Sequence, residues 1–285
     1  LSKIDFIDDE DVSRALIDTV VEWGREHGMN AIEGPLGFTD MDAEGMLIEG
    51  FDQLGTMATI YNYPYYSEFL ERMGFEKECD WVQYKMKADS GVPEKTSRIA
   101  AILKERYKIR AGSIDSLKKD PEMVKDFFKV YNDAFASAVY NFIPFTDEEI
   151  QEEAKASIPF ISDKISCILF DENDKVAAFG VSFPSISKAL QKAKGRMFPF
   201  GWIHFLKAMH NYETTDLMLN GAATEWQNKG ISALYFTEMA EKAIKAGNKW
   251  AITNPQIETN SAVNLWNSYE HELFMRRRCY IKKID

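Results

Sequence analysis

The chain has few of the residues that hold metals or form disulfides. Its three cysteines form no CxxC pair, and none of its four histidines stands at zinc-ligand spacing from a partner. The cysteines are Cys79, Cys167 and Cys279. An odd, scattered set of thiols is typical of a reduced compartment, so we expect a cytoplasmic protein without a metal site.

Long apolar runs and an excess of basic charge are also absent from the sequence. No run approaches the roughly 18 apolar residues of a membrane-spanning helix, and the N-terminus is acidic, unlike a secretory signal. The 45 acidic residues outnumber the 34 basic ones, which gives a net charge of -11. This balance argues against a protein built mainly to grip nucleic acid or an anionic membrane, although it leaves a local basic patch open.

The sequence does contain enough apolar material for two cores. A chain of 285 residues with 45% apolar content is long enough for two ordinary domains. Helical and strand periodicities both occur along it and predict an α+β fold. We place a partial domain at residues 1–90, a linker with a helix at 91–106, and a complete domain at 107–285.

Individual elements are marked by caps, turns and alternation. Residues 165–170 and 175–183 alternate around a polar turn and predict a hairpin. Helices are expected at 116–138 and behind Thr146, which is a plausible N-cap. Residues 1–7 read as a strand already under way, so we expect the sequence to be a fragment of a longer one.

The two halves of the chain end in the same order of elements, which predicts an internal repeat. In each half a glycine stops a long helix, a short strand reaches a proline, and an aromatic helix and a closing strand follow. The short strands lie between Gly28 and Pro35 and between Gly247 and Pro255. The repeat rests on the order of elements more than on identities between residues.

The segment between a strand at 216–221 and the following helix has the features of a phosphate-binding turn. Free backbone N–H groups at a helix N-terminus attract an anion, and a glycine lets the backbone approach a phosphate closely. No acid lies between Gln227 and Ala233. A tight turn without a ligand is the simpler interpretation. The residues that we assign to cofactor binding here are Asn220, Gly221, Ala222, Gln227, Asn228, Lys229, Gly230, Ile231 and Ser232.

This segment resembles the signature of the GNAT superfamily of acyltransferases, [Arg/Gln]-x-x-Gly-x-[Gly/Ala]. Gln227 and Gly230 match the signature, whereas Ser232 departs from it. The resemblance implies a mixed, mostly antiparallel sheet flanked by helices. It also implies acetyl-CoA or another acyl-CoA as cofactor, with its pyrophosphate on the turn. Backbone N–H groups near residues 220–222 are our candidates for stabilising the oxyanion of the transfer reaction.

Further along, the chain resembles the superfamily's later segment, in which an Asn contacts the pantetheine arm and a Tyr protonates the thiolate. Asn260 matches the first role, although a helix N-cap explains it equally well. The usual Tyr position holds Trp266, so Tyr269, one turn later, is our substitute for the general acid. Glu258, beside the strand end that faces the cleft in this fold, is the candidate base. A solvated loop carboxylate is the plainer interpretation of Glu258.

Over nearly its whole length the chain resembles a bacterial family of tandem-GNAT proteins of unassigned substrate. The resemblance rests on segments such as Gly34-Pro35, Gly45–Asp52 and Phe198–Trp202. Members carry another partial domain ahead, so the resemblance implies a truncated first unit. In the first copy Asp8–Asp11 takes the place of the phosphate turn, and its carboxylates would repel pyrophosphate. We therefore expect the second copy to bind the cofactor.

The acceptor is expected to be a small amine or an amino-acid-like molecule. Four residues are our candidates for contacting it, although a core helix with exposed hydroxyls is the plainer account of the tyrosines: Asn62, Tyr65, Tyr66 and Trp202. We expect no nucleic-acid or membrane partner and leave the oligomeric state open, a homodimer included. Two alternatives remain: an inactive tandem-GNAT protein that binds acyl-CoA or a partner, and an aminoacyl-tRNA-dependent transferase.

Overall fold

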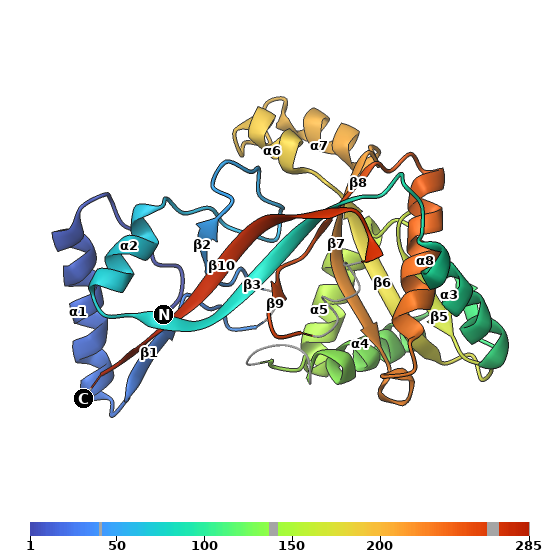
Figure 1. Cartoon of the computed structure of the whole chain (residues 1–285), viewed down its shortest axis with the longest axis horizontal. Coiled ribbons are helices and arrows are strands. Elements are labelled where there is room, and N and C mark those ends of the chain that lie inside the picture. Colours follow the sequence, from blue (N-terminus) through green and yellow to red (C-terminus); the bar gives the residue numbers. More distant parts are fainter. Residues whose placement is uncertain (40–41, 137–141, 261–267, 285) are drawn as a thin grey trace. The chain divides into compact units, whose positions relative to one another are not determined.

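The computed structural model describes residues 1–39, 42–136, 142–260 and 268–284 (Figure 1). They form two compact units, each discontinuous in sequence. Unit 1 comprises Leu1–Tyr84, Pro255–Ser261 and Leu273–Asp285, and unit 2 comprises Lys85–Asn254 and Ala262–Glu272. Among the described residues no helix combines the length and the apolarity needed to cross a bilayer.

Unit 1 packs two helices against a small sheet. Its elements are α1 (Glu10–Glu26), β1 (Ala31–Gly34), β2 (Met46–Glu49), α2 (Tyr65–Arg72), β3 (Glu76–Lys87, as far as Tyr84), β9 (Gln256–Ile257) and β10 (His271–Lys283, from Leu273). The strand order is β1-β10-β3, with β2 also paired to β10 and β9 to β3. Asp9 is the N-cap of helix α1, and its carboxylate accepts hydrogen bonds from two backbone N–H groups of the first turn. Ile17, Leu70 and Tyr280 are at the centre of the core that results.

Unit 2 is larger and carries helices on both faces of its sheet. Its helices are α3 (Glu94–Arg106), α4 (Pro121–Phe135), α5 (Asp147–Ser157), α6 (Ser187–Ala193), α7 (Gly201–Met209) and α8 (Ile231–Lys245). Its strands are β4 (Arg110–Gly112), β5 (Cys167–Phe170), β6 (Val176–Pro184), β7 (Thr214–Ala222) and β8 (Trp250–Thr253), joined by the end of β3. Short 3-10 helices lie at Ile114–Lys118, Ile158–Phe160 and Thr224–Trp226.

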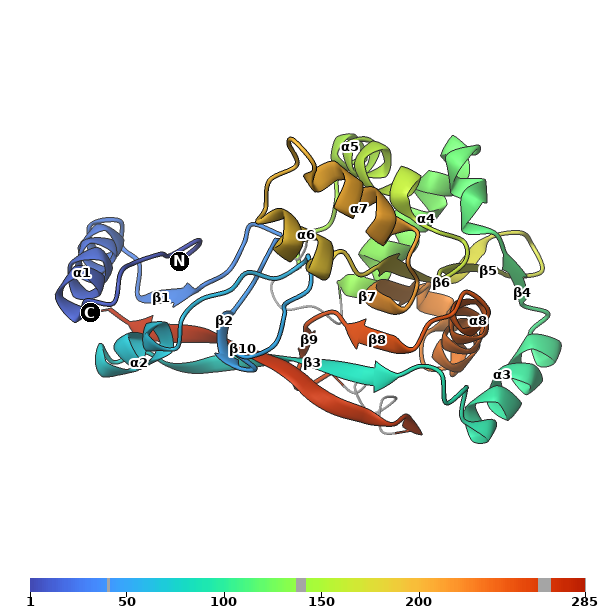
Figure 2. The same ribbon diagram turned by 90° about the horizontal axis from the view of Figure 1, so that it is seen from above.

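The strands of unit 2 run in the order β3-β8-β7-β6-β5-β4, and only the β7–β8 pairing is parallel. Strand β6 is buried on both faces, with Phe179 and Val181 in the core that α4 and α5 cover. Gly180 faces α8, where a Cβ would lie 2.0 Å from Sδ of Met239, so only glycine lets α8 pack this closely. Figure 2 shows α4 and α8 on opposite sides of these strands. The predicted mixed, mostly antiparallel sheet flanked by helices is confirmed.

Each of the two closing strands pairs with the short strand of the other half of the sequence. Strand β10, near the end of the chain, pairs with β1 in unit 1, where Ala31 lies opposite Lys283. The last residues of β3 pair with β8 in unit 2, where Lys85 lies opposite Ile252. Both pairings are antiparallel, and each joins a closing strand to the short strand that follows a glycine-stopped helix. Each closing strand is therefore paired with a strand from the other half of the sequence.

Some local expectations need correction. Residues 1–7 form no strand. The helix expected at 116–138 begins only at Pro121, because Asp120 caps it and a proline fits best in the first turn. Helices α6 and α7 were not predicted, because each is too short to repeat a helical stripe. The predicted helix behind Asn260 falls on 261–267, outside the described residues.

Candidate functional site

Strands β7 and β8 pair for only part of their length. Their parallel register ends at Leu217 opposite Thr253, after which the N–H of Asn254 donates to the carbonyl of Leu217 at 2.9 Å. Strand β7 continues to Ala222 along β6 alone. A β-bulge at Met218, where the pairing with β6 shifts by one residue, coincides with the parting.

Beyond the parting, β7 turns backbone donors toward an edge that no described strand covers. Alternate residues of a strand direct their N–H groups to opposite edges. The N–H of Ala223 donates to Ala177 next to β6, so Asn220 and Ala222 direct theirs to the open edge. Asn220 and Ala222 are two of the three positions predicted to stabilise an oxyanion, and their N–H groups are directed to this edge.

Directly after this edge the chain makes the predicted turn into α8. Asn228 and Gly230 have φ angles of 59° and 77°, and Gly230 is the N-cap of α8. No side chain caps the helix, and its first turn contains no acid. The N–H of Ala233 donates to the carbonyl of Gly230, so the N–H groups of Ile231 and Ser232 ahead of it are those that need a partner from outside the helix, which suits an anion. The side chain of Gln227 turns back and donates to the carbonyl of Ala222 at 3.3 Å, so it fixes the turn.

Aromatic rings and helix α3 border the turn. The ammonium of Lys229 lies 4.7 Å from the ring centre of Trp226 and 5.7 Å from that of Tyr107. A Cβ at Gly230 would meet Leu103 of α3 at 3.5 Å. Both views show α3 and α8 side by side (Figures 1 and 2). The turn thus carries the charge of Lys229 and packs beside α3 in unit 2.

Packing within unit 2 explains why Asn220 and Gly221, two of the predicted cofactor residues, occupy their positions. The hydroxyl of Tyr235 on α8 donates to Oδ1 of Asn220 at 2.9 Å. A Cβ on Gly221 would lie 2.9 Å from that of Ala134, so α4 packs against the bare backbone. At these positions only the backbone is left to contact a cofactor.

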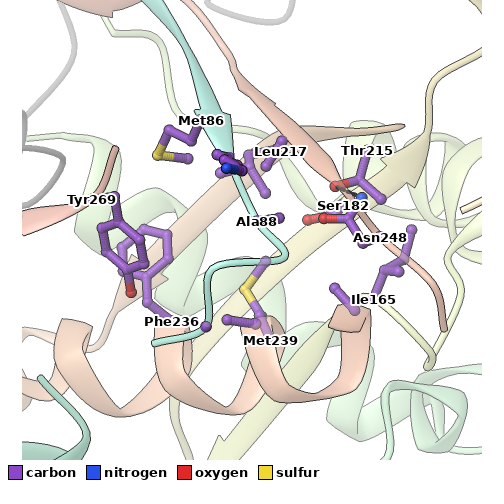
Figure 3. Close-up of a pocket in the computed structure, with 15 residues that line it drawn as sticks. Met86, Ala88, Ile165, Ser182, Thr215, Leu217, Phe236, Met239, Asn248 and Tyr269 are labelled. Carbon is purple, nitrogen blue, oxygen red and sulfur yellow. Dashed lines mark hydrogen bonds between the residues drawn. The ribbon is translucent and has the colours of Figure 1, made fainter. Parts of the chain in front are cut away.

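A cavity of about 60 Å³ lies between α8 and the sheet of unit 2 (Figure 3). Its walls are mainly apolar, and Figure 3 places Tyr269 and Phe236 at one end and the polar Ser182 and Asn248 at the other. Burial raises the pKa of Tyr269 to about 12. The hydroxyl therefore keeps its proton at neutral pH, as a general acid must.

Asp216 lies on the opposite face of β7, because its neighbours Thr215 and Leu217 line the cavity. It is 1% exposed, and neither carboxylate oxygen accepts a hydrogen bond of normal geometry from the described residues. Burial raises its pKa to about 7, and Ser185 offsets this only in part. A buried carboxylate without a partner is costly, and such groups concentrate at functional sites. Asp216 stands one residue before the end of the β7–β8 pairing.

Glu258, the predicted base, belongs to unit 1 and is held in a network of charges. Its carboxylate lies 2.5 Å from the ammonium of Lys77 and 3.7 Å from the guanidinium of Arg276. Lys77 and Arg276 also contact the buried Asp80, which forms a bidentate pair with Arg278. Glu258 therefore lies in a cluster of two carboxylates and three basic side chains.

The predicted acceptor residues are divided between the two units. Asn62 is buried in unit 1 and bonds both the N–H and the carbonyl of Leu47, so it fixes β2. The hydroxyl of Tyr65 donates to the carbonyl of Phe6, and that of Tyr66 to the carboxylate of Asp5. Trp202 lies on α7 in unit 2. Asn260 is described, and its backbone N–H donates to the carbonyl of Ile257.

Unit 2 alone therefore brings together the turn, the open edge and Tyr269. The sequence reasoning missed Asp216 and the bulge at Met218. An acid inside an otherwise apolar strand is a signal that would have found Asp216, whereas the bulge depends on pairing with β6 and leaves no local mark. No cluster of three or more metal-ligating side chains occurs in the described part of the chain.

Comparison with known proteins gives two curated relatives and a fold. No protein-family model matches the chain. Protein YghO of Escherichia coli K12 is 26% identical across 99% of this chain and 73% of its own length. The bacterial ceramide synthase of Caulobacter vibrioides is 28% identical across 70% of this chain. The chain spans about half of that enzyme's length, 51%.

Two solved structures share the fold. The GCN5-related glucosamine N-acetyltransferase region of a fungal GH3 β-N-acetylglucosaminidase has a TM-score of 0.55 and 13% identity, covering 94% of this chain and 27% of that one. A GCN5-related N-acetyltransferase from Sphaerobacter thermophilus has a TM-score of 0.51 and 11% identity, covering 95% of this chain and 69% of that one. The chain therefore has the fold of the GCN5-related N-acetyltransferases, as its sequence resemblance implied.

Proposed function

We propose that the protein transfers an acyl group from acyl-CoA to an amine. The observation that carries the proposal is the parting of β7 from β8 immediately ahead of the uncapped N-terminus of α8. A pyrophosphate on the α8 turn would be met by free N–H groups and by Lys229. The acyl carbonyl would then lie along the open edge of β7, near the N–H groups of Asn220 and Ala222.

The acceptor that we test first is a long-chain amine. A ceramide is the amide of a fatty acid and a long-chain amino alcohol, and the Caulobacter relative is named for making one. This relationship favours a fatty acyl-CoA and a lipid amine over the acetyl-CoA and small or amino-acid-like amine expected from the sequence. Both pairs belong to one reaction class and need the same site.

Each proposed group has one role in the transfer. A base removes the proton of the amine, the nitrogen bonds to the thioester carbon, and the carbon–sulfur bond breaks. We assign the protonation of the departing thiolate to Tyr269, whose side chain lines the cavity beside α8. For the base we propose Asp216 as a second candidate in addition to Glu258, because the carboxylate of Asp216 has no partner of normal geometry among the described residues. A carboxyl pKa near 7 suits a base that works at neutral pH.

A thiol-release assay tests the reaction and the two bases together. Purified protein is given acetyl-CoA or palmitoyl-CoA with a panel of small amines, amino acids and long-chain amino alcohols. Asp216→Asn and Glu258→Gln are compared with the wild type. We expect amine-dependent release of CoA that falls by about 10²-fold or more in Asp216→Asn and little in Glu258→Gln.

The opposite order of the two variants would assign the base to Glu258. Binding of acyl-CoA without turnover of any amine would contradict the enzymatic proposal and leave an acyl-CoA-binding protein.

A further inference from the structure

The segment between Asp174 and Glu213 contains no acidic residue, in a chain whose net charge is -11. It includes α6, α7 and the connection between them, which we call the α6–α7 hairpin (residues 187–209). Five basic residues of the hairpin are exposed, namely Lys188, Lys192, Lys194, Arg196 and Lys207. None of the five forms an ion pair with any described residue. The hairpin is thus a local basic surface whose charges are not neutralised within the described chain.

The same hairpin exposes large apolar side chains. Phe198 is 82% exposed and Phe200 68% exposed. Leu190, Met197, Trp202 and Leu206 are exposed as well. Most large apolar side chains of a folded domain are at least half buried, and a group of exposed ones marks a surface that something else covers.

The connection that carries the phenylalanines has a defined structure. The indole N–H of Trp202 donates to the carbonyl of Pro199 at 3.0 Å, and the backbone N–H of Trp202 donates to the carbonyl of Met197 at 2.9 Å. A Cβ on Gly201 would lie 1.8 Å from the carbonyl oxygen of Arg196, so the glycine permits this close turn. Figures 1 and 2 show α6 and α7 side by side, joined by this connection. The fold therefore specifies the exposure of the aromatic rings.

Charge complementarity decides what the surface fits. Unpaired Lys and Arg side chains beside protruding aromatic rings match the boundary of an anionic bilayer, where headgroups carry negative charge and rings enter the acyl region. Lys and Arg stems also cover apolar surface while their charges stay in water. The negative net charge of the chain opposes adsorption elsewhere on the molecule, so binding would be confined to the hairpin.

We propose that the α6–α7 hairpin docks the protein reversibly on the surface of an anionic phospholipid bilayer. Phe198 and Phe200 enter the interface, and the five basic side chains contact the headgroups. The docking needs no membrane-spanning segment and does not depend on the proposed reaction. It differs from our expectation, drawn from the net charge, that no membrane takes part.

Vesicle co-sedimentation tests the proposal. The wild type is mixed with vesicles of phosphatidylglycerol and phosphatidylcholine, or of phosphatidylcholine alone, at low and high salt. We expect at least about tenfold tighter binding to the anionic vesicles, reduced by salt. The double variants Phe198→Ser/Phe200→Ser and Lys192→Glu/Lys194→Glu should each lower that binding at least about tenfold.

Phe38→Ser is the matched control, because Phe38 is a phenylalanine of unit 1 that is 88% exposed. It should bind as the wild type does, and far-UV circular dichroism should show all variants folded. The proposal is overturned if the wild type stays in the supernatant when anionic vesicles are sedimented. Binding of an acidic protein to the hairpin would not rescue it. Equal binding by the hairpin variants and the control would overturn it too.

Discussion

Replacing Asp216 by Asn should reveal the cost of its buried charge through the pH dependence of stability. The carboxyl has an ordinary pKa of 3.8, and burial raises it to about 7 in the folded protein. The folded state therefore keeps a proton that the unfolded chain has lost between these two values. Stability contributed by the protonated form is complete below pH 3.8 and is lost as pH rises to about 7.

The size of the effect follows from the two pKa values. Each unit of difference corresponds to about 1.4 kcal/mol, so about three units correspond to roughly 4 kcal/mol. Asn has nearly the shape of Asp but does not titrate, so any constant cost of burying its amide cancels between two pH values. The free energy of unfolding of Asp216→Asn minus that of the wild type should rise by roughly 4 kcal/mol between pH 4 and pH 8.

Urea unfolding, followed by intrinsic fluorescence at a series of pH values, measures this difference directly. Glu258→Gln is the control, because Glu258 is ion-paired at the surface of unit 1 and should not give the same rise. A stability difference between Asp216→Asn and wild type that stays constant from pH 4 to pH 8 would refute our account of Asp216.

Three further predictions follow from the packing and the site. Arg277→Met should raise the free energy of unfolding by about 1 to 4 kcal/mol, because Arg277 is 1% exposed and its Nε and Nη1 have no partner among the described residues. Urea unfolding measures this change, and a large loss of stability in the variant would mean that the guanidinium does have a partner. Gly180→Ala should cost about 1 to 3 kcal/mol, and Met239→Ala should restore part of that loss in the double variant, since the new Cβ would meet Sδ of Met239. Purely additive effects of these two changes would contradict the contact. Tyr269→Phe should keep its circular dichroism spectrum and lower kcat by about 10² to 10⁴ for unactivated thioesters, and an unchanged kcat would remove Tyr269 as the acid.

Elements that depend on local chemistry were predictable from the sequence. Thr146 forms a capping box with Glu149, and the Asp171 turn joins two antiparallel strands as expected. The Gly230 turn opens α8 with a positive φ, which only the glycine adopts readily. In each case the residues that decide the geometry lie within a few positions of one another.

Features that depend on distant pairing were not predictable. The pairings of β10 with β1 and of β3 with β8 join residues that no local pattern connects, such as Ala31 and Lys283. The isolation of Asp216 depends on which helices cover its face of the sheet. The hydrogen bonds between Asn62 and Leu47 of β2 join residues that are fifteen positions apart in the sequence. These facts belong to the assembled fold.

The central claim is that the turn before α8 binds the pyrophosphate of an acyl-CoA, and calorimetric titration with acetyl-CoA and palmitoyl-CoA tests it most directly. Gly230→Glu places a carboxylate in the turn. Gly247→Glu is the control, because Gly247 lies just past the other end of the same helix and has a similar φ angle, 91° against 77° for Gly230. We predict roughly micromolar binding by the wild type and by Gly247→Glu, and at least about a tenfold loss in Gly230→Glu. Equal binding by all three proteins, or none by the wild type, would contradict the claim.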